Sequence, residues 1–100
     1  MSDPVAVILR FKGDSHDLLE GFEQARRSWI EDQDDGFKPP AFFVMCATEE
    51  GITVITGWDT DEDHRAFAHG MGPRLERAGA PRPDGHEHLR IAKLGWSPTV

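Results

Sequence analysis

The amino-acid sequence predicts one α+β domain of the ferredoxin-like type, spanning residues 1–100 with the element order βαββαβ. Its 100 residues are the length of a single domain. Two segments carry apolar residues at helical spacing, and four carry β-branched or alternating apolar residues. Each helical segment lies between two strand segments. This pattern predicts an antiparallel sheet in the order 4-1-3-2, with both helices on one face.

The first strand and helix follow from residues 4–31. Residues 4–12 have apolar side chains on both sides of an extended chain, which predicts a strand that is covered on both faces. Gly13 ends the strand, and Ser15 is the expected helix N-cap. The helix that follows should bury a stripe made of Leu18, Leu19, Phe22, Ala25, Trp29 and Ile30.

A hairpin is expected after the acidic loop that Pro39 and Pro40 close. Segments 41–48 and 52–58 are apolar, and Glu49, Glu50 and Gly51 suit a three-residue loop. That loop would place Thr48 opposite Ile52, Cys46 opposite Val54, Val44 opposite Thr56 and Phe42 opposite Trp58.

The second helix should open in the acidic run 59–63, where Thr60 and Asp63 have capping-box spacing. Gly72 and Pro73 predict a kink or restart within it. A last strand is expected over 87–95, followed by a tail that begins at Trp96. The apolar face of this helix should consist of Phe67, Met71, Leu75 and Ala78.

The bulk properties exclude several classes of partner. The net charge of −7 argues against nucleic acid and anionic membranes, since both need a basic surface. Neither apolar run, Val5–Leu9 or Ala41–Ala47, approaches the length of a membrane span. The start of the chain lacks the basic region of a signal peptide. The single cysteine, Cys46, suits a reducing compartment, so we expect a cytoplasmic protein.

The predicted sheet is apolar on both faces, although two helices can cover only one. A second copy of the chain could cover the other face, which predicts a homodimer. A domain of this length also buries a modest core by itself.

The strand Val5–Lys12, the hairpin 41–58 and the segment Gly57–Asp63 resemble the dimeric α+β barrel superfamily, in particular its antibiotic-biosynthesis-monooxygenase-like (ABM-like) branch. The pattern of predicted strands and helices is similar over nearly the whole chain. The resemblance implies a homodimer with a small-molecule cavity between sheet and helices. The expected function is monooxygenase- or isomerase-like activity on a planar acidic organic compound, without a tightly bound cofactor.

The resemblance also assigns individual residues. Trp58 matches the functional tryptophan of the family. The oxygenases and haem degraders of the family use a first-strand asparagine, and this chain contains no asparagine. Where the haem-ligating histidine should stand, near the end of the second helix, the chain has Glu76 and Arg77. The fold therefore carries over better than either mechanism, and fold alone does not give function.

Three strand residues are candidates for holding an anionic ligand. Arg10, His88 and Arg90 share the sequence parity of Ala6 and Ile8, which predicts that they point from one sheet face toward the cavity. Guanidinium groups there would bind a carboxylate or phenolate of the ligand. The alternative is that both arginines form solvated ion pairs near the strand ends.

His64 and His69 are the candidates on the second helix. Five residues apart, they lie about 140° apart around the helix axis and do not share a face. His69 and His88 are candidate proton-transfer residues, and Trp58 and His64 are candidate ligand contacts. The alternative places His69 on the surface.

No metal site or cofactor is predicted. His86 and His88 share one side of the last strand near Asp84, but no further ligand stands at a recognisable spacing. A non-catalytic, ligand-binding or accessory dimer is the alternative to an enzyme, because the sequence shows no assembled nucleophile, base and acid.

Overall fold

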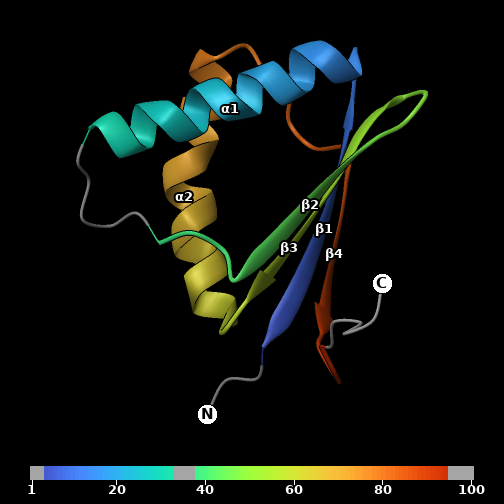
Figure 1. The fold of residues 1–100 in the computed structure, drawn as a ribbon, viewed down its shortest axis with the longest axis vertical. Helices are drawn as coiled ribbons and strands as arrows, with labels where there is room; N and C mark the ends of the chain where they lie inside the picture. The colour runs from blue at the N-terminus through green and yellow to red at the C-terminus, as the bar shows by residue number, and fades with distance from the viewer. Residues whose placement is uncertain (1–3, 33–37, 95–100) are drawn as a thin grey trace, which may run out of the picture.

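A computed structural model of the chain describes residues 4–32 and 38–94. The four strands form one antiparallel sheet in the order β2-β3-β1-β4, which is the predicted order. Both helices lie on the same side of this sheet (Figure 1). The elements are β1 (Val5–Lys12), α1 (Ser15–Glu31), β2 (Phe42–Ala47), β3 (Gly51–Trp58), α2 (Asp61–Arg77) and β4 (Gly85–Arg90).

The two sheet faces differ in what covers them. On β1, the side chains of Val7 and Phe11 are buried under the helices, at 0% and 3% exposure. Ile8 and Arg10 alternate with them and point to the other side. We call these sides the helix face, which contains Val7, Leu9 and Phe11, and the open face, which contains Ile8 and Arg10. Among the described residues, no helix covers the open face (Figure 1).

The hairpin register differs by one residue from the prediction. Ala47 lies opposite Ile52, Cys46 opposite Thr53 and Phe42 opposite Gly57. The predicted pairing was wrong because Gly51 belongs to β3, and its backbone carbonyl accepts a hydrogen bond from the amide of Thr48 at 2.8 Å. A one-residue shift moves every side chain of a strand to the other face. Cys46 therefore lies on the open face.

The bounds of other elements also differ from the prediction. The last strand is Gly85–Arg90 rather than 87–95. A kink or restart was predicted at Gly72 and Pro73, whereas α2 is one helix from Asp61 to Arg77 with Pro73 inside it. Arg74 Nη1 donates to the Gly70 carbonyl at 3.0 Å in this part of the helix. Trp96 and the central part of the acidic loop, 33–37, lie outside the described residues.

Two apolar clusters hold the layers together, one packing α1 on the sheet and the other packing α1 against α2. The first joins Phe11, Leu18, Ile52 and Val54, and the second joins Ala25, Trp29 and Met71. Trp29 is therefore a core residue. Ile30, which was predicted to share its stripe, is 46% exposed.

The N-cap predicted for α2 is correct, whereas the N-cap predicted for α1 is wrong. Thr60 caps α2 as predicted, and its Oγ1 accepts from the Asp63 amide at 3.1 Å. Asp14 rather than Ser15 caps α1, because its carboxylate accepts from the Asp17 amide at 3.0 Å.

We expect Asp14→Ala to lower the free energy of unfolding by about 1 kcal/mol, because an amide at the helix start loses its partner. Urea denaturation would measure the loss. The matched control is Ser15→Ala, which should stay within about 0.5 kcal/mol of the parent protein. A larger loss in the control than in Asp14→Ala would assign the cap to Ser15.

Candidate functional site

An apolar cavity of about 310 Å³ lies between the helix face of the sheet and α2. Its size is at the lower end of the range for small-molecule sites. Most of its wall is apolar or aromatic, and its polar side chains are mainly histidines near β4. The lining includes Leu9, Phe11, Trp58, Phe67, Met71, His64, His86 and His88.

Trp58 forms the end wall of this cavity and is 2% exposed. Its ring is tilted against Phe67 at 4.9 Å and meets His64 edge-on at 5.5 Å between centroids. The indole Nε1 donates to the Thr56 hydroxyl at 2.8 Å. Trp58 therefore offers a ring surface to a ligand, while its one polar atom already has a partner.

His64 is the buried polar residue of the site. It lies in the first turn of α2 and is 9% exposed. Its Nδ1 is buried and has no hydrogen-bond partner among the described residues. Burial lowers the pKa of His64 below that of a free imidazole, and the nearby charge of His88 lowers it further. The imidazole is therefore held neutral near pH 7.

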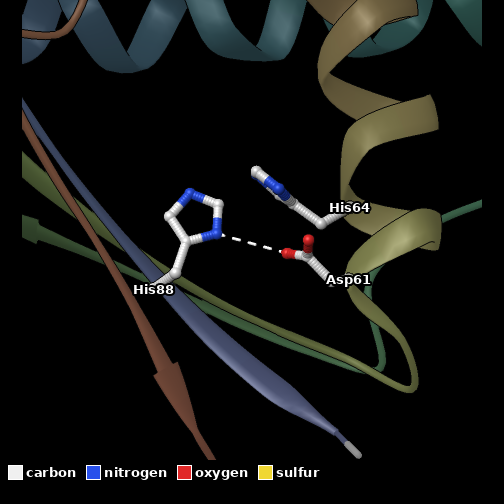
Figure 2. A group of neighbouring side chains, drawn as sticks. All are labelled: Asp61, His64 and His88. Atoms are coloured by element: carbon white, nitrogen blue, oxygen red, sulfur yellow. Dashed lines mark hydrogen bonds and ion pairs between the residues drawn. The ribbon is translucent and has the colours of Figure 1, made fainter. Parts of the chain in front are cut away.

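His88 and Asp61 complete a polar corner beside His64, shown in Figure 2. The rings of His64 and His88 are 5.0 Å apart between centroids, and His88 Nδ1 lies 3.3 Å from Asp61 Oδ1. Asp61 Oδ2 also pairs with Arg65 at 2.7 Å. Burial acts to raise the pKa of Asp61, but the His88 hydrogen bond and the Arg65 charge outweigh it and lower the pKa.

The structure separates the three strand residues that were predicted to share a face. Arg10 points to the open face, where its Nη1 pairs with Glu87 at 3.1 Å. His88 lies opposite Val7, so it is on the helix face. Arg90 is exposed at the end of β4 and does not line the cavity. The predicted shared face is therefore wrong for Arg10, which forms the solvated ion pair given as the alternative, and neither arginine lines the cavity.

His69 is also outside the cavity. It is exposed on α2 and is absent from the cavity wall, as the angle between His64 and His69 indicates. The prediction that His69 reaches the cavity is wrong. Of the six predicted site residues, the structure brings together Trp58, His64 and His88.

Asp61 was missed by sequence reasoning. It precedes His64 by three residues, so the two side chains share one helix face. That spacing could be read from the sequence. The approach of His88 from β4 could not be predicted from it, because it depends on the register of the sheet.

Within the described residues, no helix has the length and apolar composition needed to span a membrane.

Comparison of the sequence with family models and with curated proteins gave no match. Solved structures with a fold similar to that of this chain were found. A protein described as an antibiotic biosynthesis monooxygenase from Chloroflexus aurantiacus superposes with a TM-score of 0.62 and 13% identity, over 92% of this chain and 97% of that one. SnoaB, a cofactor-independent oxygenase from Streptomyces nogalater, gives a TM-score of 0.56 and 14% identity, over 97% and 99%. The chain therefore has the ferredoxin-like α+β fold of the antibiotic-biosynthesis-monooxygenase-like proteins.

Proposed function

We propose that the protein binds a planar, polycyclic aromatic molecule in this cavity and oxidises it as a monooxygenase without an organic cofactor. The observation that carries the proposal is the apolar, aromatic-walled cavity with a buried neutral imidazole, His64, in its wall. The likeness in fold to a cofactor-independent oxygenase supports the reaction class. The described wall of this first cavity contains no arginine or lysine, so the part of the ligand that it holds is bound by apolar contact.

A second hollow suits an elongated ligand. It has a volume of about 380 Å³ and opens toward the β2 edge, beside Pro39, Phe43 and Met45. The first cavity opens toward β4, at the other edge of the sheet. The two share part of their walls, so that one fused-ring molecule could extend from one into the other. The shared residues are Phe22, Val54, Thr56, Phe67 and Met71.

The chemistry follows from the position of His64. A CH₂ group flanked by two aromatic rings that are joined by a carbonyl, as in an anthrone, can lose a proton to a neutral imidazole, because the negative charge is delocalised onto the carbonyl oxygen. The resulting carbanion is oxidised by dioxygen. Overall, the CH₂ carbon and O₂ give a carbonyl group and one water, with four electrons passing from carbon to oxygen. His88 lies next to His64 and can relay the proton to solvent, since its side chain is 40% exposed.

The open face supports a homodimer as part of the same proposal. Val44 and Leu89 are 46% and 49% exposed on this face, next to the partly buried Ile8 and Ile55. A second sheet packed against them would bury these side chains. That arrangement matches the dimeric barrel that the sequence resemblance implies.

Trp58→Leu tests ligand binding. With a tricyclic hydroxyanthrone as the probe, we expect at least about tenfold weaker binding, because one aromatic contact worth ~1.4 kcal/mol is lost. Isothermal titration calorimetry would measure it, with circular dichroism to confirm folding. Arg10→Ala is the matched control and should bind as the parent protein does. Equal loss in both variants would contradict the placement of the ligand.

Oxygen consumption tests the reaction. We expect uptake of one dioxygen per anthrone converted, and a rate at least about 100-fold lower in His64→Gln, the usual effect of losing a general base. Binding without turnover would identify the alternative, a non-catalytic binding module. Exchange of the CH₂ protons without oxygen uptake would indicate an isomerase-like activity instead.

A further inference from the structure

Asp61, His64 and His88 form a compact group of metal-ligand types at the mouth of the cavity (Figure 2). One potential ligand atom from each lies within 4.8 Å of the others. Asp61 and His64 come from one turn of α2, and His88 reaches them from β4. We propose that these three residues bind one divalent transition-metal ion.

The buried imidazole is the first argument for an ion. His64 is nine-tenths buried, and its Nδ1 has no hydrogen-bond partner in the part of the chain that the structure describes. A buried polar atom without a partner is unfavourable unless it is compensated. The described residues give this imidazole nitrogen no partner. A metal ion bound at this corner would give the His64 imidazole one.

The geometry requires only a small adjustment. Ligands about 2.0–2.2 Å from a zinc ion lie roughly 3–3.5 Å from one another. Asp61 Oδ1 and His88 Nδ1 are already 3.3 Å apart. His88 is 40% exposed and can rotate toward the buried His64. The ion pair of Asp61 Oδ2 with Arg65 holds the carboxylate in orientation, as an outer partner of a ligand does.

The ligand types select the ion. Two imidazole nitrogens and one carboxylate favour zinc, cobalt or nickel over calcium and magnesium, which prefer oxygen ligands. Three protein ligands leave positions open on the ion. Because His64 and His88 line the cavity, those positions would face a molecule bound there. The site is defined by protein residues alone. An ion held by His64 would take the imidazole lone pair that the proposed base uses, so the metal-bound form and the base-active form of His64 are alternatives.

Zinc titration of the whole protein, after treatment with a chelator, tests the site without any organic ligand. We expect one zinc ion bound per chain by calorimetry, and cobalt to give visible absorption bands typical of nitrogen and oxygen ligands. His88→Gln and Asp61→Asn should each weaken zinc binding at least about tenfold. Magnesium at the same concentration should not compete.

His69→Gln is the matched control, since His69 lies on the same helix but outside the cluster, and it should bind zinc as the parent protein does. Asp61 and His88 are partly exposed, so their variants should fold, which circular dichroism would verify even if His64→Gln does not. The proposal is overturned if the parent protein binds no zinc below about 1 mM. It is also overturned if His88→Gln and Asp61→Asn both bind zinc with the affinity of the parent protein.

Discussion

Replacing Trp29 by alanine is expected to lower the free energy of unfolding by about 3–5 kcal/mol, the usual effect of emptying a large aromatic site in a core. The side chain is 2% exposed and stacks on Phe67 with centroids 5.4 Å apart. The Arg74 guanidinium lies over its ring at 4.8 Å. Domains of this size are stable by only about 5–15 kcal/mol, so the variant should be close to unfolding at 37 °C.

The close approach of the helices makes this site hard to refill. A Cβ atom built on Gly70 would lie 2.3 Å from the Trp29 ring, so the ring occupies the space in which α2 has no side chain. The side chains of α2 that contact the ring, Phe67 and Arg74, would have to move to fill that space. The part of the lost stability that comes from the empty cavity should therefore be nearly undiminished.

Urea denaturation followed by circular dichroism would measure the change. Ile30→Ala is the matched control because Ile30 is adjacent in sequence and 46% exposed. It should lose less than about 1 kcal/mol. Similar losses for the two variants would show that Trp29 does not hold α1 to α2.

The second large effect is expected at the open face. We expect the parent protein to be a dimer in sedimentation equilibrium, and Val44→Glu combined with Leu89→Glu to weaken it at least about 100-fold, or ~2.7 kcal/mol. Each substitution would place a carboxylate against the apolar sheet of the partner, and burying an unpaired charge is unfavourable. The folded monomer should be little affected, since both positions are about half exposed.

Phe43→Glu is the control for this experiment. Phe43 is 56% exposed and adjacent to Val44, but it points to the helix face. Its substitution should leave the dimer intact. A parent protein that sediments as a monomer at millimolar concentration would show that the proposed dimer is wrong, and the apolar open face would then need another explanation.

The sequence predicts the fold well because each element carries its own pattern. The apolar stripes of α1 and α2 and the alternation in β3 do not depend on distant residues. The order of strands followed from the short hairpin and from crossover handedness. The boundaries were less predictable. Pro73 lies inside a continuous helix, although the pattern of Gly72 and Pro73 predicted a kink or restart there.

Three of the predicted site residues lie together in the cavity wall, and the misplacement of Arg10 relative to His88 has a clear physical origin. Arg10 and His88 were assigned to one face by parity, yet parity across two strands has meaning only when their register is known. In the structure His88 lies opposite Val7 and Arg10 opposite Gly85, so the two point to opposite sides. Trp58 and His64 both line the cavity, and both lie at the junction between β3 and α2, where sequence distance is short.

The position of the two cavity openings has a consequence for how ligands are exchanged. Both cavities lie on the helix face, one lined by residues of β4 and the other by residues of β2, whereas the proposed partner chain would cover the open face. A molecule could therefore enter at one edge and leave at the other while the two subunits stay together. The rate of ligand release should then be independent of protein concentration, even near the concentration at which the dimer separates.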